Sequence, residues 1–167
     1  MIKINVAEIK KRLVGEKTLA YELSPAELEI AAEELAVDGT VNLEGTMSNA
    51  GDVLLLQAVM TAKVRRTCSR CLKDFTGKTR AEVVEKFYPA SAEHIENDAF
   101  VYDSDVIDIT EPLREGLLLA EPMQALCKLD CRGLCPVCGA DLNDGDCGCD
   151  RFTVDPRLAA LKQFIKN

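Results

Sequence analysis

One stretch of the sequence decides the fold: VLLLQAVMTAKVRRTCSRCLKDFTGKTRAEVVEKF, residues 53–87. In its first part, apolar residues occupy alternate positions, namely Leu54, Leu56, Ala58, Met60, Ala62 and Val64. Because successive side chains of a β-strand point to opposite faces, this alternation predicts a long, half-buried strand over residues 53–66. A second strand is expected over residues 75–87. The two strands would form a hairpin whose tip is residues 68–71, CSRC.

Shorter elements are expected on both sides of this hairpin. Alternating apolar residues predict an opening strand over residues 2–6 and another over 41–45. Helices are predicted where apolar residues recur at helical spacing, over residues 7–14, 24–35, 111–120 and 155–165. Residues 89–105 are acidic and lack periodicity, so a mobile loop is expected there. The predicted fold class is α+β: an antiparallel sheet or meander with a few short helices and a C-terminal cysteine-rich segment, in which six cysteines between residues 127 and 149 predict zinc binding.

Length and composition fit one globular domain, or one domain with a small appendage. The chain has 167 residues, of which 47% are hydrophobic and 29% charged. We expect residues 1–105 to form a mainly antiparallel β region with N-terminal helices and an acidic loop. Residues 106–167 are expected to form a helix, a zinc-knuckle segment and a C-terminal helix, and the two regions to pack as one unit. No apolar run approaches the roughly 20 residues that span a bilayer, and no secretory signal is visible, so we expect a cytoplasmic protein.

Charge is distributed unevenly along the chain. The formal net charge is −8, which argues against a protein that wraps nucleic acid over its whole surface. Residues 63–80 nevertheless hold seven basic side chains against one acid, a local charge of +6. Two interpretations stay open: a solvated face that pairs with the acidic residues 81–111, or a patch that contacts a few phosphates. The candidate RNA-contacting residues are Lys63, Arg65, Arg66, Arg70, Lys73, Lys78 and Arg80.

Eight cysteines are the strongest chemical signal in the sequence. Two form the pair Cys68-x2-Cys71, and six lie within 23 residues, at Cys127, Cys131, Cys135, Cys138, Cys147 and Cys149. In a reducing compartment, thiols clustered this densely favour metal binding over disulfides. Two residues between cysteines allow both sulfurs to reach one tetrahedral ion at about 2.3 Å. After Cys138, Gly139 can adopt the positive φ that aims a backbone N–H at a thiolate.

Eight thiols suffice for two four-cysteine sites. They can be divided in about 35 ways; the preferred grouping is Cys135, Cys138, Cys147 and Cys149 in one site, and Cys68, Cys71, Cys127 and Cys131 in the other. We expect two zinc ions in closed, structural sites, because four thiolates leave no position for water. An iron–sulfur cluster is the alternative metal group, although the ferredoxin spacing is absent. A redox role for the first CxxC pair is a further alternative.

No catalytic motif accompanies the cysteines. The sequence has no phosphate-binding glycine loop, no HExxH, and no Ser or Cys nucleophile with a matching histidine. Its single histidine, His94, lies in the acidic segment. We therefore expect a protein that is not an enzyme and has no small-molecule substrate.

Four motifs follow one another along the chain: CSRCLKDF at residues 68–75, LCKLDCRGLCPVCGADLN at 126–143, CGC at 147–149 and DPRLAAL at 155–161. Together they resemble the YceD family, described as large ribosomal RNA subunit accumulation proteins. The chain is similar to the cysteine-rich form of Gram-positive and related bacteria and of chloroplast relatives. The enterobacterial form keeps the first CxRC pair and lacks most of the second cluster. The resemblance implies a cytoplasmic factor that supports the synthesis, processing or stability of 23S rRNA, and it supplies no catalytic residue.

Three functions are compatible with these observations. The first is a non-enzymatic ribosome-biogenesis factor whose basic hairpin, kept rigid by zinc, contacts 23S rRNA or its precursor. The second is a zinc-stabilised adaptor that binds a basic ribosomal protein or a nuclease through its acidic surface. The third is a thiol redox sensor. The sequence leaves open the RNA site, the protein partner and the oligomeric state.

Overall fold

The structure is a computed structural model that describes residues 1–12, 14–97, 99–151 and 157. The chain divides into two compact units. Unit 1 comprises Met1–Arg66 and Phe75–Met123, and unit 2 comprises Thr67–Asp74 and Gln124–Asn167. The division at residue 105 that the sequence suggested stays a prediction. The C-terminal helix expected over residues 155–165 lies outside the described residues, apart from one position.

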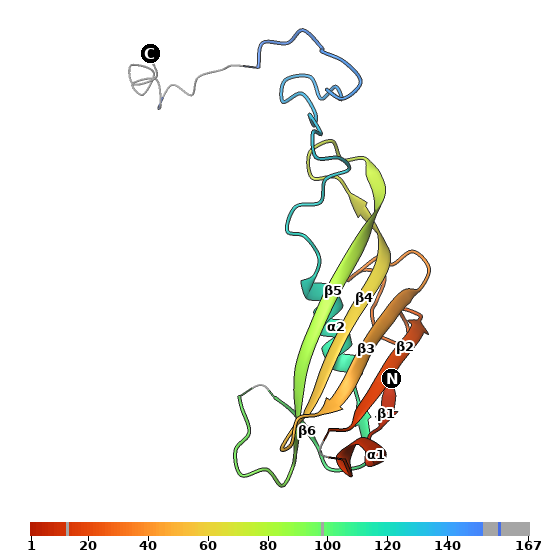
Figure 1. Ribbon diagram of the computed structural model, residues 1–167. Helices are drawn as coiled ribbons and strands as arrows, with labels where there is room; N and C mark the ends of the chain where they lie inside the picture. The colour runs from red at the N-terminus through yellow and green to blue at the C-terminus, as the bar shows by residue number, and fades with distance from the viewer. Residues whose placement is uncertain (13, 98, 152–156, 158–167) are drawn as a thin grey trace. The chain divides into compact units, whose positions relative to one another are not determined.

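Unit 1 is built around a five-stranded sheet with the strand order β2-β3-β4-β5-β6 (Figure 1). The strands are β2 (Glu16–Leu23), β3 (Val41–Asn49), β4 (Leu54–Thr67), β5 (Asp74–Pro89) and β6 (Phe100–Tyr102). Strands β2, β3 and β4 pair antiparallel in succession, and β6 pairs parallel to β5. A separate two-stranded sheet joins β1 (Lys3–Asn5) to β7 (Val106–Asp108). The helices are α1 (Ala7–Lys10) and α2 (Thr110–Leu119), so the predicted α+β class is confirmed.

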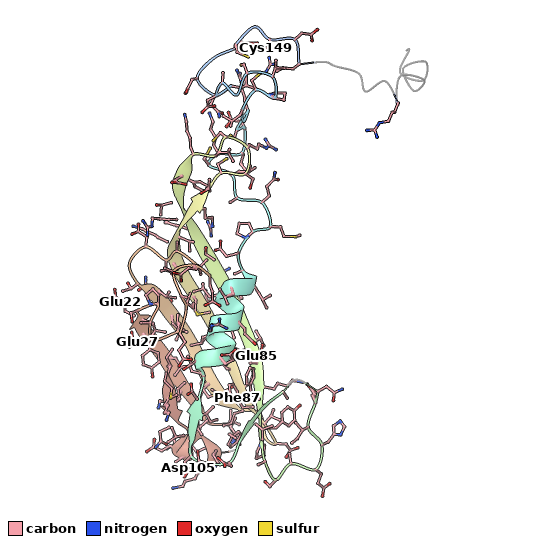
Figure 2. All side chains as sticks on the ribbon, turned by 180° about the vertical axis from the view of Figure 1, so that it is seen from behind. Glu22, Glu27, Glu85, Phe87, Asp105 and Cys149 are labelled. Carbon is pink, nitrogen blue, oxygen red and sulfur yellow. The ribbon has the colours of Figure 1, made fainter. Side chains whose placement is uncertain are left out.

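Helix α2 lies across one face of this sheet and closes the core (Figures 1 and 2). Its Leu113 and Leu117 are fully buried, and Gly116 approaches Val83 of β5 so closely that a Cβ atom would not fit. The apolar alternation of β4 faces the same core, at Leu54, Leu56, Ala58, Met60, Ala62 and Val64. On the opposite face of β4, the apolar Leu55 and Val59 are half-buried, and the exposed residues are polar: Gln57, Thr61, Lys63 and Arg65. No helix in the described residues is long and apolar enough to cross a membrane.

The helix predicted over residues 24–35 is wrong, although its start signal is present. The backbone N–H of Ser24 donates to Glu27 Oε2 at 2.7 Å, and the Ser24 hydroxyl donates to the same oxygen at 2.8 Å. After this single turn, Glu29 adopts a φ of 56°, the left-handed conformation that ends helices. The neighbouring Leu28 is fully buried. Burial of apolar side chains in successive turns therefore outweighs the local helical propensity.

The second correction concerns residues 89–105, for which the sequence predicts a loop. Strand β6 lies within this segment and pairs with the end of β5. Phe100 of β6 stacks on Phe87 of β5 with ring centroids 5.3 Å apart. A strand of three residues is too short to show the period-two pattern by which strands are identified. The sequence therefore does not predict β6.

Unit 2 has little regular structure and hardly any aliphatic core in its described residues. It contains the tip between β4 and β5 and the cysteine-rich segment. Its buried side chains are those of Cys68, Cys71, Cys131, Cys135 and Leu142. Thiols thus take the place in this unit that leucine, valine and methionine take in unit 1.

Candidate metal centres

The structure brings the eight cysteines together in two groups of four. The first thiol group consists of Cys68, Cys71, Cys127 and Cys131, and the second of Cys135, Cys138, Cys147 and Cys149. Within each group, all four sulfur atoms lie within 4.8 Å of one another. This is the grouping preferred from the sequence. Among the described residues, these two groups are the ones whose donor atoms could hold a metal ion.

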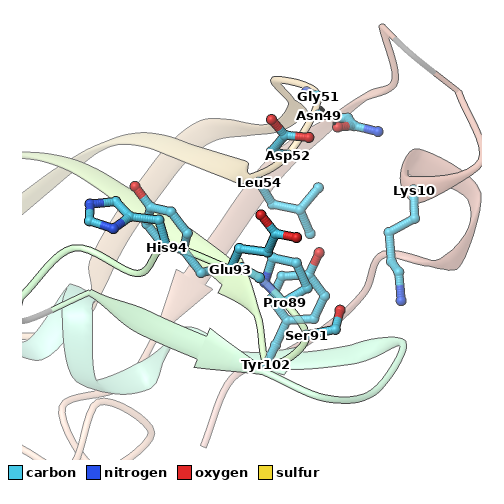
Figure 3. Close-up of a pocket in the computed structure, with 12 residues that line it drawn as sticks. Lys10, Asn49, Gly51, Asp52, Leu54, Pro89, Ser91, Glu93, His94 and Tyr102 are labelled. Carbon is cyan, nitrogen blue, oxygen red and sulfur yellow. Dashed lines mark hydrogen bonds between the residues drawn. The ribbon is translucent and has the colours of Figure 1, made fainter.

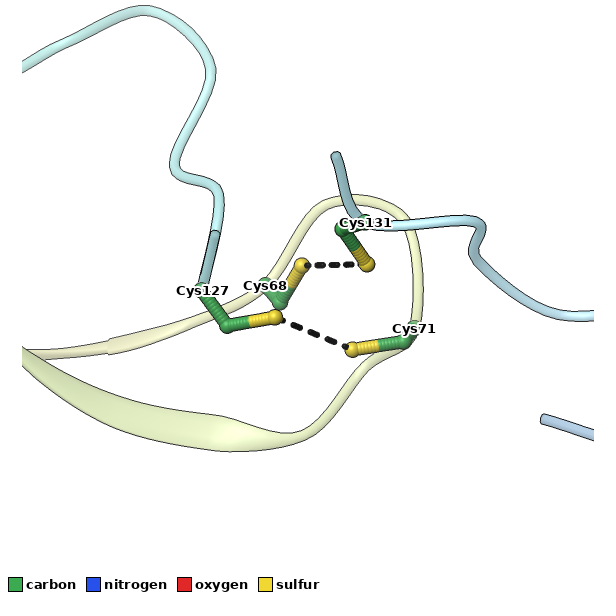
Figure 4. A group of neighbouring side chains, drawn as sticks. All are labelled: Cys68, Cys71, Cys127 and Cys131. Atoms are coloured by element: carbon green, nitrogen blue, oxygen red, sulfur yellow. Dashed lines mark hydrogen bonds between the residues drawn. The ribbon is translucent and has the colours of Figure 1, made fainter. Parts of the chain in front are cut away.

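The first thiol group has the spacing of a tetrahedral site (Figure 4). The sulfurs of Cys68 and Cys131 are 3.8 Å apart, and those of Cys71 and Cys127 are 3.7 Å apart. A disulfide would need about 2.05 Å. Four sulfurs placed about 2.3 Å from one central ion stand about 3.8 Å from each other by tetrahedral geometry. The donor set therefore fits one tetrahedral metal ion.

The two CxxC turns share one backbone arrangement. In each, the N–H of the residue after the second cysteine donates to the carbonyl of the first, at 3.0 Å for Leu72 and 2.9 Å for Gly139. The N–H of the first cysteine donates to the carbonyl two residues beyond the second, at 2.9 Å and 2.8 Å respectively. Leu72 and Gly139 both have positive φ, 58° and 76°. The sequence indicates this conformation at Gly139 but gives no sign of it at Leu72.

Backbone dipoles favour a thiolate at the first position of each turn. Hydrogen bonds from the backbone of Cys71, and next of Cys127, lower the pKa of the Cys68 thiol to about 6. Burial, followed by hydrogen bonds to neighbouring thiols, raises the pKa of Cys127 to about 12. One member of the group is thus prepared to ionise, whereas burial keeps another protonated. A divalent cation among the four sulfurs would stabilise their thiolate forms.

The second thiol group repeats this electrostatic pattern. Backbone hydrogen bonds from Cys138 and then Val137 lower the pKa of Cys135 to about 6. Hydrogen bonds to the thiols of Cys138 and Cys147 raise the pKa of Cys149 to about 12. The two groups differ in burial: Cys138 is exposed, whereas three of the four cysteines in the first group are buried.

Two basic residues of the tip bind the rest of unit 2. Nη1 of Arg70 donates to the carbonyl of Cys131 at 2.9 Å, and the Leu134 N–H donates to the Arg70 carbonyl at 3.1 Å. Nζ of Lys73 lies 2.7 Å from Asp141 Oδ2, and this ammonium group lowers the pKa of Asp141 to about 2. Both residues therefore already have partners within their own unit.

Asn143 supports the first thiol group, a role that the sequence analysis missed. Its Nδ2 donates to Cys131 Sγ at 3.4 Å, and this hydrogen bond, the largest contribution, lowers the pKa of Cys131. The same amide nitrogen donates to Asp141 Oδ1 at 2.7 Å. Asp141 thus links Lys73 to Asn143. The sequence does contain a signal for this role, because Asp141 and Asn143 both belong to the motif GADLN at the end of the second CxxC turn.

Arg66, another predicted RNA contact, is bound within unit 1. Its Nε donates to Glu121 Oε2 at 2.7 Å and its Nη2 to Glu121 Oε1 at 2.6 Å, a bidentate pair. The hydroxyl of the buried Thr79 donates to Glu121 Oε1 at 2.8 Å and also contacts Arg66. The Arg66 side chain is only 10% exposed. A guanidinium held in this way is poorly placed to reach a phosphate.

The remaining predicted RNA contacts lie on the open face of the sheet in unit 1. Lys63 and Arg65 are exposed on β4, and Lys78 and Arg80 are exposed on β5. Arg80 pairs with the exposed Glu82. The other three have no ion-pair partner among the described residues. The seven candidate RNA contacts therefore fall into two sets. Arg66, Arg70 and Lys73 are held by partners within their own units, whereas Lys63, Arg65, Lys78 and Arg80 are exposed on the sheet.

A pocket of unit 1 carries no chemistry comparable to that of the thiol groups (Figure 3). It is lined by residues from α1, the turn after β3, the segment after β5 and β6, including Lys10, Glu93, His94 and Tyr102. Lys10 is already paired with Asp105 at 2.8 Å. His94 belongs to neither group of potential metal ligands among the described residues.

Comparison with known proteins gives one family and several relatives. A family model described as "Large ribosomal RNA subunit accumulation protein YceD" matches residues 56–165. An uncharacterized protein of Mycobacterium tuberculosis is 32% identical over 149 residues, covering 85% of this chain and 70% of its own length. The uncharacterized protein YlbN of Bacillus subtilis is 35% identical over 104 residues, covering 59% of each chain. No solved structure matches.

Proposed function

The chain belongs to the YceD family of large ribosomal RNA subunit accumulation proteins, and on this premise we propose that it is a non-enzymatic factor supporting the synthesis, processing or stability of 23S rRNA in the cytoplasm. Family membership by itself supports a role in ribosome biogenesis. The observation that carries the proposal is the extent of the match, which runs from β4 through both thiol groups.

We propose further that each thiol group holds one zinc ion in a closed, structural site. The sulfur separations of 3.7 and 3.8 Å support this for the first group, and the repeated turn geometry extends it to the second. Zinc bound by four thiolates would join distant parts of unit 2 and offer no open position for a substrate. The role of this chain's own residues is to hold the thiolates: backbone N–H groups and Asn143 donate to the sulfurs.

The rRNA contact is proposed to be direct and to use the basic segment of residues 63–80. Support comes from three exposed cations, Lys63, Arg65 and Lys78, which have no ion-pair partner in the part of the chain that the structure describes, on a chain of net charge −8. Phosphate contacts of this kind supply most of the non-specific affinity of proteins for nucleic acid. A local basic patch is sufficient for docking on rRNA even when the whole chain is acidic.

Ultraviolet cross-linking in growing cells, followed by sequencing of the attached RNA, tests the proposed contact. We expect reads concentrated in one region of 23S rRNA or its precursor. The control is an unrelated acidic protein of similar size carrying the same tag. Equal read distributions for the two proteins would contradict direct contact. Depletion of the protein should lower 23S rRNA relative to 16S rRNA, and an unchanged ratio would contradict the ribosomal role itself.

One observation favours a second candidate, a protein adaptor. Three apolar side chains beside the cysteines are exposed: Leu72 at 64%, Leu129 at 94% and Val137 at 62%. Exposed apolar side chains that gather on one surface mark sites of protein interaction. A nuclease-treated pull-down that retains a basic ribosomal protein or a nuclease would support the adaptor. Recovery of partners only when RNA is left intact would favour the rRNA-contacting factor.

A further inference from the structure

The sheet face opposite α2 carries a groove of about 620 Å³ within unit 1. The side chains that give it its chemistry are Thr40, Asn42, Thr61, Lys63, Lys78 and Arg80. We call it the sheet-face groove. The six side chains come from β3, β4, β5 and the segment that precedes β3. Because β3, β4 and β5 are consecutive in the sheet, the groove has a rigid floor.

The charge of the groove is positive and largely unneutralised. Lys63 and Lys78 have no ion-pair partner among the described residues, and Arg80 pairs only with Glu82, itself exposed on the same strand. Asp38 is the single acid in the lining. By contrast, the basic residues Arg66, Arg70 and Lys73 are held by Glu121, Cys131 and Asp141, respectively. The free positive potential of segment 63–80 is therefore concentrated on the sheet face.

The cations form a regular array. Lys63 and Arg65 are two residues apart on β4, as are Lys78 and Arg80 on β5, a spacing of about 7 Å along each strand. The neighbouring strands are separated by about 4.8 Å. Successive phosphates of a nucleic acid strand follow one another on this same scale. Hydroxyl and amide groups of Thr61 and Asn42 lie among the cations and are suited to sugar and phosphate oxygens.

The groove lacks what base recognition would need. No aromatic side chain lines it, so it offers no platform on which bases could stack. We propose that the sheet-face groove binds the sugar–phosphate backbone of RNA and leaves the bases outside. This inference rests on the proposed rRNA contact and narrows it from the whole basic segment to one face of unit 1. It makes affinity strongly dependent on salt and nearly independent of base sequence.

The test compares two double variants of the full, zinc-loaded chain. Lys63→Gln with Lys78→Gln removes two charges from the groove, and Lys3→Gln with Lys11→Gln removes two exposed charges elsewhere in unit 1. Fluorescence anisotropy measures binding of labelled single-stranded oligoribonucleotides of different base composition over a range of salt concentrations. The groove variant should bind all of them roughly tenfold more weakly. Its plot of log affinity against log salt should be shallower by about 1.4, the contribution of two phosphate contacts on a single strand.

Three distinguishable outcomes would contradict the proposal that the sheet-face groove binds the RNA backbone. If the groove variant binds as the control variant does, while Lys128→Gln with Arg132→Gln in unit 2 weakens binding, RNA contact stands and its site is elsewhere. If oligomers of one base composition bind far better than the others in the unmodified protein, backbone-only recognition is wrong. If the unmodified protein binds no RNA under any salt condition, both this inference and the proposed direct rRNA contact fail.

Discussion

Units 1 and 2 stabilise their folds by different means. Every residue of the aliphatic core belongs to unit 1, where side chains of β3, β4, β5 and α2 pack together. In unit 2, cysteines make up nearly all of the buried side chains among the described residues. A sheet and helix can bury enough apolar area to fold on hydrophobic grounds, whereas a segment rich in turns cannot. We therefore expect the folding of unit 2 to depend on metal and the folding of unit 1 to be independent of it.

Loss of one thiolate should have the largest effect, and this effect should be confined to unit 2. Cys68→Ser should remove the ion of the first thiol group and unfold that part of unit 2, because metal binding to such sites is worth about 10 kcal/mol or more. Cys147→Ser is the matched variant for the second group. Elemental analysis of anaerobically purified protein should give two zinc ions for the unmodified chain and one for each variant. Two ions in either variant would show that the substituted cysteine is not a ligand.

A core substitution in unit 1 should have the opposite selectivity. Leu117 is fully buried on α2, so Leu117→Ala should cost about 2–5 kcal/mol of unfolding free energy. The zinc content should stay unchanged, because no thiol belongs to this unit. Chemical denaturation and elemental analysis of the same preparation measure both effects. Loss of zinc in this variant would mean that unit 2 depends on the core of unit 1.

The Arg66–Glu121 pair gives unit 1 a dependence on pH. Arg66 is the main reason that the pKa of Glu121 lies below its ordinary value of 4.5. A carboxyl with a lowered folded-state pKa contributes its full stability above the ordinary value and loses it as pH falls through the lowered value. Glu121→Gln should therefore cost about 1.5–3 kcal/mol at neutral pH and reduce the loss of stability below about pH 4.

The unfolding of unit 1 by denaturant is measured between neutral and acidic pH, with the loss of α2 as the signal. The control is Glu33→Gln, which removes an exposed carboxyl outside this cluster. Identical acid sensitivity in Glu121→Gln and in the unmodified protein would contradict the assigned role of Glu121.

The smallest expected effects distinguish the two CxxC turns. Leu72 and Gly139 occupy equivalent left-handed positions, where a residue other than glycine costs roughly 1–2 kcal/mol. Leu72→Gly should thus stabilise unit 2 slightly, or be neutral after loss of chain entropy. Gly139→Leu should destabilise the second turn by roughly 1–2 kcal/mol, since space at this position is open. Competition with a chelator measures both changes, and equal affinities in all three proteins would show that the left-handed position imposes no cost on a side chain in either turn.

The sequence predicts the central strands of the five-stranded sheet but not its edge strands, β2 and β6. Strands β4 and β5 are long enough for their alternation to be unmistakable, and both are confirmed within two residues at each end. Strand β2 has only two buried residues in eight, so its alternation is hidden. The predicted helix over residues 24–35 is wrong because Glu29 reverses the backbone after one turn. That reversal depends on tertiary packing, which local propensity does not register.

The thiol grouping was within reach of the sequence, but the state of the basic residues was not. Cysteine spacing supports the second group, whose four members lie between residues 135 and 149, and the first group is then the preferred use of the remaining four thiols among about 35 possible divisions. Nothing in the spacing of Arg66, Arg70 and Lys73 indicates that Glu121, Cys131 and Asp141 engage them. These partners are about 55 to 70 residues away in sequence. Charge counts therefore overestimate the surface available to RNA.

Hydrogen exchange of the same protein with and without metal shows whether unit 2 alone depends on metal for its fold. After anaerobic treatment with a strong chelator, we predict that backbone amides of unit 2 exchange at the rate of an unfolded chain. Those of β3, β4 up to Arg66, and α2 should keep their protection, and added zinc should restore unit 2. Protection of residues 124–151 that survives complete metal removal would contradict the dependence of unit 2 on metal. A loss of protection in both units together would contradict the independence of unit 1.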